Sequence, residues 1–139
     1  MIAQVSVNYL AVLAAAVASM VVGFIWYGPL FGKLWISLMN FDKKKMQEAQ
    51  KKGMGKTYAL AFLTSLIMSY VLAQFVGYVQ AATIAEGTVL AFWLWLGFFA
   101  TTQLGMVMWE GKPVKLYLLN TLHYLVTLGV MASILAVWI

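Results

Sequence analysis

Three polar residues, Asn120, His123 and Thr127, interrupt the last apolar stretch of the chain. Spacings of three and four residues place their side chains on one face of a helix. His123 is the only histidine in the sequence, and an imidazole can exchange protons or bind ligands near neutral pH. The group is therefore a candidate for a proton-sensitive or ligand-binding site. The alternative is a structural role, in which a neutral His123 hydrogen-bonds to a hydroxyl or amide of another helix.

A second set of polar residues lies midway along the preceding apolar stretch: Thr101, Thr102 and Gln103. Polar groups are costly in an apolar environment, so some of these side chains must face protein or a cavity. Glu110 follows at the end of this stretch, where the dipole of a helix disfavours a negative charge. It either forms a solvated pair with a nearby lysine or contributes to a polar mouth with Lys33 and Asn120. We therefore place the candidate ligand-binding site between the last two apolar stretches, with Thr101, Gln103 and Glu110 on one side.

The sequence contains no combination of residues typical of an enzyme or a metalloprotein. It has no cysteine, which excludes disulfides, thiolate metal sites and a cysteine nucleophile. One histidine, without a thiol or a carboxylate in the middle of an apolar stretch, cannot complete a zinc shell from one chain. There is also no phosphate-binding loop, no paired carboxylates and no nucleophile–base–acid set. We therefore predict no catalytic residue, no metal and no cofactor.

The stretches that carry these residues are apolar enough to lie in lipid. Hydrophobic residues make up 64% of the chain and charged residues 9%, whereas soluble domains have about 25% charged residues. Four stretches reach the roughly 20 residues that a spanning helix needs, at about residues 8–27, 57–78, 84–109 and 116–138. Because backbone groups in lipid must be satisfied within each segment, we predict helices, the third beginning at a capping box of Thr83 and Glu86. The expected fold is all-α: a single-domain integral membrane four-helix bundle.

The lysines predict the orientation of this bundle. Seven of the nine basic residues lie between the first and second spans, and the other two, Lys112 and Lys115, lie between the third and fourth. Cytoplasmic loops carry the excess of lysine and arginine, so we expect both termini to lie outside the cytoplasm. The basic connection at residues 28–56 either binds anionic lipid or serves as a solvated topology signal. Lysines beside a bilayer, without an element that reads bases, make nucleic-acid binding unexpected.

The sequence GFIWYGPLFGKLW, at residues 23–35, marks the basic end of the first span. Trp26 and Tyr27 stand where an aromatic belt is expected. Gly28 should end the helix, and Pro29 suits the first position of another. The polar residues between positions 30 and 40 form one narrow stripe, which indicates a short interfacial amphipathic helix. We assign the interfacial anchor to Trp26, Tyr27, Pro29, Lys33 and Trp35.

Small residues recur at intervals of about four along the spans. In lipid, helices associate where their backbones can approach closely, and small side chains permit that approach. We assign helix packing to Ala15, Ser19, Gly23, Ser65, Ser69, Gly97 and Gly105. Four short spans form a thin bundle, so we also expect a homo-oligomer.

Several short motifs resemble one family over nearly the whole chain. They are Asn8-Tyr9-Leu10-Ala11, the corner Trp26-Tyr27-x-Pro29-x-Phe31-Gly32-Lys33-x-Trp35, and Glu110-Gly111-Lys112 with Asn120 and Tyr124 downstream. The chain thereby resembles domain-of-unknown-function family 1761, a group of small bacterial membrane proteins, and the Trp-Tyr-x-Pro corner is the most specific part of the likeness. The resemblance implies four spans in a bacterial inner membrane. It implies no activity, ligand or catalytic residue.

Three functions are compatible with these features. The first is an oligomeric helical bundle that binds or transports a small molecule. Small four-helix multidrug exporters have a similar size, but they use a membrane-embedded acid in the first span, where this chain has only Asn8 and Ser19. The second is a structural or accessory subunit that packs against a membrane partner. The third is a membrane enzyme acting on lipid or quinone, for which the sequence shows no nucleophile or metal set.

Overall fold

The computed structural model describes residues 5–39, 47–48, 53 and 55–138. Five lysines of the basic connection, Lys43, Lys44, Lys45, Lys51 and Lys52, lie outside the described residues, as does position 40 at the end of the predicted interfacial helix. The described part of the chain is helical and contains no strand. The all-α prediction is therefore confirmed.

Four helical segments in the described residues are long and apolar enough to cross a membrane: Tyr9–Leu30, Gly55–Val79, Ile84–Met108 and Val114–Val137. Each begins and ends within three residues of the span expected from the sequence. The protein is a multi-pass membrane protein.

The first span consists of α1 (Tyr9–Ile25) and a π-helical turn, η1 (Trp26–Leu30). A short helix, α2 (Gly32–Met39), follows it, and the second span is α4 (Gly55–Val79). The third span is made of α5 (Ile84–Leu94), a second π-helical segment η2 (Trp95–Ala100), α6 (Thr101–Gln103) and α7 (Gly105–Met108). The fourth span is one continuous helix, α8 (Val114–Val137).

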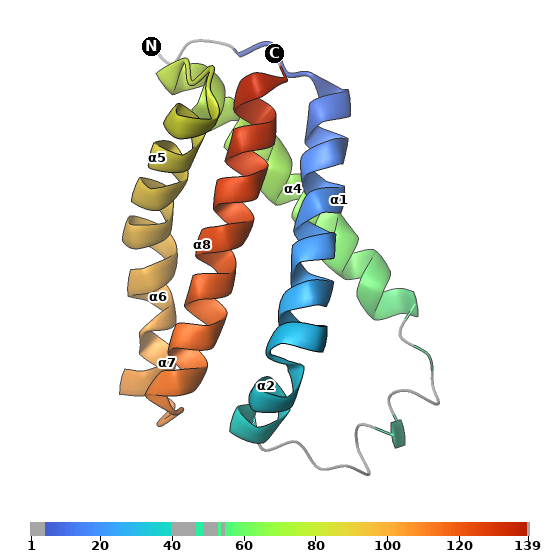
Figure 1. Cartoon of the computed structure of the whole chain (residues 1–139), viewed down its shortest axis with the longest axis vertical. Helices are drawn as coiled ribbons and strands as arrows, with labels where there is room; N and C mark the ends of the chain where they lie inside the picture. Colours follow the sequence, from blue (N-terminus) through green and yellow to red (C-terminus); the bar gives the residue numbers. More distant parts are fainter. Residues whose placement is uncertain (1–4, 40–46, 49–52, 54, 139) are drawn as a thin grey trace.

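The central element of the bundle is α8. It contacts α1, α4 and α5, and α1 also packs against α4. Figure 1 shows α5 and α1 on either side of α8, with α4 crossing obliquely behind them. Both ends of the chain lie at one end of the bundle, whereas α2 and the turn between α7 and α8 lie at the other. Lys33 on α2, Lys112 in that turn and Lys115 in the first turn of α8 are therefore at the end away from the termini.

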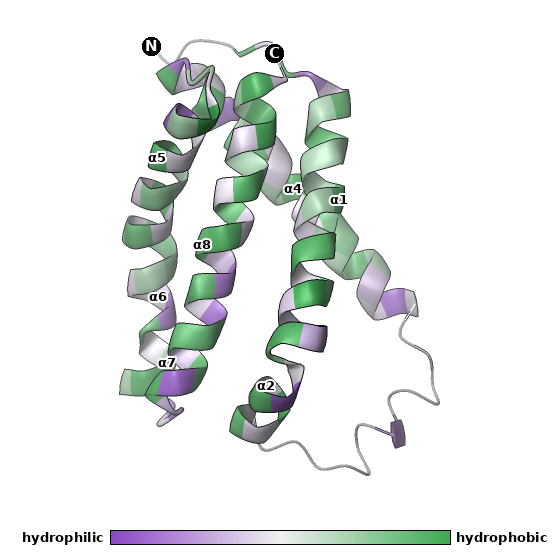
Figure 2. Ribbon diagram, viewed as in Figure 1, coloured by the Kyte–Doolittle hydropathy of each residue, from purple (hydrophilic) through white to green (hydrophobic). Residues whose placement is uncertain are grey.

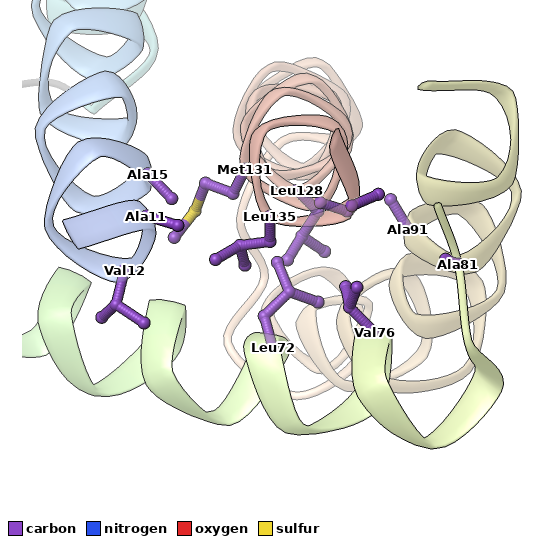
Figure 3. Packing of buried hydrophobic residues seen from close by; sticks show 12 residues of the cluster. Ala11, Val12, Ala15, Leu72, Val76, Ala81, Ala91, Leu128, Met131 and Leu135 are labelled. Atoms are coloured by element: carbon purple, nitrogen blue, oxygen red, sulfur yellow. The ribbon is translucent and has the colours of Figure 1, made fainter. Parts of the chain in front are cut away.

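The hydrophobic core occupies the half of the bundle nearer the chain ends (Figure 3). Its buried members are Ala11, Val12, Ala15, Leu72, Val76, Ala81, Ala91, Leu128, Met131, Ala132, Leu135 and Ala136. Many of them are alanines, which let the helix backbones approach closely. Ser69 is fully buried at the crossing of α4 and α1, where its Oγ donates to the backbone oxygen of Val12 at 2.8 Å. The predicted packing residues Ala15, Ser19 and Ser69 are buried.

Side chains cap the beginnings of the first and third spans. Asn8 Oδ1 accepts from the backbone N–H groups of Leu10 and Ala11, at 3.0 and 3.3 Å. Thr83 Oγ1 accepts from the backbone N–H of Glu86 at 3.1 Å, as the capping box predicts. In a full capping box the carboxylate of Glu86 would accept from the backbone N–H of Thr83. Here it accepts from the Thr83 hydroxyl at 3.1 Å. Glu86 therefore belongs to the N-terminal cap of α5.

The predicted helix break at Gly28 and Pro29 is wrong. Pro29 does not begin a new helix but lies inside η1, which continues α1. The backbone N–H of Phe31 donates to Trp26 O at 2.9 Å, the five-residue spacing of a π turn, so the turn closes without a donor from Pro29. The next helix begins at Gly32, where a Cβ would lie only 2.7 Å from the carbonyl oxygen of Tyr27. The chain therefore bends one turn later than the sequence indicates.

A close contact between α5 and α8 occurs at Gly87. A Cβ at this position would lie 2.8 Å from the carbonyl oxygen of Ala132, closer than real side chains approach a backbone. Gly87 is not part of the four-residue repeats, so its role is not apparent from the sequence. Gly97, a predicted packing residue, is exposed, and no described atom lies within 4 Å of its Cβ position. Gly105 is half-buried and faces Trp109 of its own turn.

Replacing Gly87 with alanine should lower the free energy of unfolding by about 1–3 kcal/mol, because the new methyl group pushes α5 away from the backbone of α8. The measurement is unfolding of the purified protein by SDS in mixed micelles, followed by circular dichroism. Gly129→Ala is the matched control, since no atom lies within 4 Å of a Cβ on Gly129. It should be neutral or stabilising by up to about 1 kcal/mol, as expected for glycine to alanine inside a helix. Equal stabilities of the two variants would contradict the close approach at Gly87.

Candidate functional site

The polar face of α8 brings His123 and Thr127 into contact. His123 is 9% exposed and Thr127 is 3% exposed. Thr127 Oγ1 lies 3.3 Å from His123 Nε2, as their spacing of four residues allows. His123 Nδ1 is buried, and it has no hydrogen-bond partner among the described residues. A ring nitrogen in this state can still accept or donate one hydrogen bond.

Trp26 and Tyr27, at the corner of the first span, cover this face. Tyr27 Oη donates to Asn120 Oδ1 at 2.8 Å, and Trp26 Nε1 donates to the backbone oxygen of Leu119 at 3.1 Å. The ring centroid of Tyr27 lies 4.9 Å from that of His123, and the centroid of Trp26 lies 6.0 Å from it. The two aromatic residues therefore bind α8 inside the bundle, a role that the aromatic-belt interpretation did not include.

A second tryptophan binds α8 from the side of the third span. Trp95 Nε1 donates to the backbone oxygen of Thr121 at 2.6 Å, and Tyr117 Oη donates to Ala100 O at 2.6 Å. Trp95 and Ala100 are the first and last residues of η2. Both π-helical segments thus begin with a tryptophan that donates to α8, Trp26 in η1 and Trp95 in η2. No signal in the sequence predicts the π-helical geometry, so this pairing was missed.

A cavity of about 330 Å³ lies beside His123, among α1, α4 and α8. Its polar lining consists of Ser19, Tyr58, Thr64, Ser65, His123, Tyr124 and Thr127. Gly23 faces the imidazole, since a Cβ there would lie 3.8 Å from His123 Nε2. The hydroxyls of Ser19 and Thr64 donate to carbonyls of their own helices, at 2.7 and 2.8 Å. The lining contains no charged side chain.

The position of this cavity follows from the oblique course of α4. The two helices meet where Ser69 bonds to Val12 of α1, and farther from the chain ends α4 diverges from α1 (Figure 1). Gly23 and Ser65, which we assigned to helix packing, line the hollow at this level. Ser65 Oγ lies 3.7 Å from Met20 Sδ, across the gap between the two helices.

The other candidate residues lie elsewhere. Thr101 is exposed and donates to Gly97 O of its own helix at 2.6 Å, as threonines in helices commonly do. Gln103 is half-buried on α6, and its Oε1 is buried without a partner in the described part of the chain. Glu110 is exposed in the turn before α8. None of the three lines the cavity beside His123, which lies among the first, second and fourth spans and not between the third and fourth.

The cavity lies beside the more polar half of α8. Figure 2 shows the hydrophilic residues of α8 in the half of the helix nearer α2, away from the apolar core. The cavity offers hydroxyls and one imidazole among apolar walls. Among the described residues, no group of three or more histidine, cysteine, aspartate or glutamate side chains could hold a metal ion. The geometry can accommodate a small uncharged molecule with a hydrogen-bonding group.

The family model with the description "Protein of unknown function (DUF1761)" matches residues 10–136. Comparisons with curated proteins and with solved structures gave no match. The matched range includes the corner at Trp26 and Tyr27 and nearly all of α8. The chain therefore belongs to the DUF1761 family of proteins of unknown function.

Proposed function

We propose that the protein binds a small molecule inside the membrane, in the cavity beside His123. One observation carries this proposal: the imidazole of His123 lines the cavity, with its Nε2 3.3 Å from Thr127 Oγ1 and 3.8 Å from the Cβ position of Gly23. A ligand with one hydrogen-bonding group would bond to this end of the ring or to the hydroxyl of Thr127.

The size and lining of the cavity restrict the ligand. A volume of about 330 Å³ is near the lower end of the range of roughly 300–1,000 Å³ that is typical of small-molecule sites. Its walls carry hydroxyls and apolar groups but no charge, so a charged ligand would lose its hydration without compensation. These features support a compact, uncharged molecule. They support binding more than catalysis, because the lining holds no carboxylate or amine that could act together with the imidazole of His123.

A second candidate function, assembly with another membrane helix, is supported by the outer face of the third span. Gly97 and Thr101 are exposed there, and the space around Gly97 is open within the described residues. Small residues on an outer face suit close contact with another helix in lipid. This face could pack against a second copy of the chain or against a different membrane protein, as the expected homo-oligomer or accessory subunit requires.

For the membrane setting, we propose a bacterial inner membrane with both termini outside the cytoplasm. Lys33, Lys112 and Lys115 lie at the end of the bundle opposite the termini. In membrane proteins, loops rich in lysine and arginine stay on the cytoplasmic side, which supports this orientation. The same lysines would bring the basic end of the bundle close to anionic lipid headgroups.

The first experiment uses octan-1-ol that carries a photoreactive diazirine in its chain, with the protein in lipid nanodiscs. The probe should label residues around the cavity in a saturable manner, and excess unmodified octanol should compete. Gly23→Leu should lower this labelling at least fivefold, because the new side chain occupies the cavity beside the imidazole. Labelled positions are mapped by mass spectrometry of peptides.

Gly129→Leu is the control for that experiment. Gly129 lines a separate hollow of about 630 Å³ between α5 and α8, so its substitution should leave labelling near His123 unchanged. Both variants must unfold at SDS concentrations close to that of the natural chain. Non-saturable labelling, or labelling that Gly23→Leu leaves intact, would refute binding in this cavity.

The orientation can be tested by cysteine labelling, because the chain has no cysteine of its own. A membrane-impermeant maleimide should label Ser6→Cys in intact spheroplasts. It should label Lys112→Cys only after the membrane is permeabilised, since that turn lies at the opposite end of the bundle. The reverse pattern would invert the proposed topology.

The outer face of the third span can be tested with Gly97→Cys. If this face joins two copies, oxidation in native membranes should yield a disulfide-linked dimer, because small-residue contacts bring helix backbones close together. Ile67→Cys, an exposed position on α4, is the control and should cross-link less. A purely monomeric Gly97→Cys protein after oxidation would exclude a symmetric contact at Gly97.

A further inference from the structure

A second hollow adjoins the cavity beside His123. It has a volume of about 400 Å³ and lies among α4, η2 and α8. Besides Met68, its lining consists of Val71, Leu72, Phe75, Leu94, Phe98, Phe99 and Leu128. All of these side chains are apolar, so this hollow is suited to hydrocarbon.

The two hollows are separated by very little protein. Met68 of α4 lines both of them. Tyr124 lines the cavity beside His123, and its ring centroid lies 5.1 Å from that of Phe99, which lines the apolar hollow. Methionine is unbranched and flexible, and it commonly adapts to what it packs against. A change in the Met68 rotamer would therefore change the separation between the two hollows.

Both hollows border the lipid-facing surface of the bundle. At the cavity beside His123, Phe24 is 55% exposed and Tyr58 is 47% exposed, with their ring centroids 5.7 Å apart. At the apolar hollow, Phe98 is 64% exposed. In a membrane these exposed aromatic residues contact acyl chains, so a molecule dissolved in the bilayer can reach either hollow from the side.

We propose that the two hollows form one site for a single-chain amphiphile taken from the bilayer, with an uncharged hydrogen-bonding head beside His123 and a hydrocarbon chain in the apolar hollow. This inference rests on the function proposed above and specifies its ligand class. The head is uncharged because neither hollow is lined by a charged side chain, and an unpaired charge inside a membrane is costly. The chain passes Met68, the residue that both hollows share.

The test uses hexadecan-1-ol with a diazirine near the far end of its chain, again with the protein in nanodiscs. The probe should label the apolar hollow, at positions such as Phe75, Phe98 and Phe99. Gly23→Leu should reduce this labelling at least fivefold, although Gly23 lines only the other hollow, because it displaces the head of the same molecule. Gly129→Leu should leave it unchanged. Labelling at Phe98 and Phe99 that is insensitive to Gly23→Leu would indicate ordinary surrounding lipid and overturn the proposal.

Two related probes test the head. Hexadecane and hexadecanoate with the same diazirine should label the apolar hollow at least fivefold less than the alcohol. The alkane lacks a group for the imidazole, and the carboxylate brings a charge into an uncharged site. Equal labelling by either probe would overturn the assignment of an uncharged polar head.

A Val71→Trp variant separates this inference from the proposed function. Val71 lines only the apolar hollow, so the larger side chain should lower hexadecanol labelling of Phe98 and Phe99 while octanol labelling beside His123 persists. If octanol labelling responds to Gly23→Leu and hexadecanol labelling does not, the single elongated site is wrong and the smaller site stands. If octanol labelling itself does not respond to Gly23→Leu, the proposed function fails first.

Discussion

A helix that carries polar side chains through lipid must have them covered by protein, and this constraint governs the arrangement around α8. Lipid cannot supply hydrogen bonds, so each buried polar group requires a partner in the protein. Tyr27 provides one for Asn120, and Thr127 provides one for His123. Trp26 and Trp95 approach from opposite sides and donate to backbone carbonyls of α8. The first and third spans thereby hold α8 in the middle of the bundle.

The oblique course of α4 divides the bundle into two unlike halves. Near the chain ends α4 lies against α1 and α8, and small and aliphatic side chains form the apolar core there (Figure 3). Toward the basic end α4 diverges from α1, so the polar face of α8 is only partly covered. The cavity beside His123 occupies that space. The apolar core and the proposed binding site therefore lie in different halves of the same four helices, and a change at Gly87 and a change at Gly23 should act independently.

The sequence predicts the spans well because their signal is strong: long apolar runs that carry no charge in the middle. The capping residues Thr83 and Glu86 were also readable, since the side-chain types and their spacing specify the bond. The corner at Pro29 was not, because a π turn has no known sequence signal and a proline after a glycine is normally a helix break. For the same reason Trp26 and Tyr27 could be recognised as aromatic residues at a span end, but not as hydrogen-bond donors to α8.

The candidate site was only partly predictable. Spacing alone placed His123 and Thr127 together on one helix face, but it could not show which other spans cover that face. We expected the third span, because Thr101, Gln103 and Glu110 are polar. In the structure the hydroxyl of Thr101 is satisfied by its own helix, and the small residues of the first and second spans line the cavity instead. Small residues permit either a close helix contact or a hollow, and the crossing angle of the helices decides between them.

The most direct test of this account is solid-state NMR of the protein in lipid bilayers, with His123 and Gly23 isotopically labelled. Because the chain has one histidine, all imidazole signals belong to His123. The account predicts a through-space contact between the imidazole and Gly23, since a Cβ on Gly23 would lie 3.8 Å from Nε2. An imidazole that contacts only lipid acyl chains and water, with no contact to Gly23, would show that the first span does not cover α8 at this level and would contradict the proposed site.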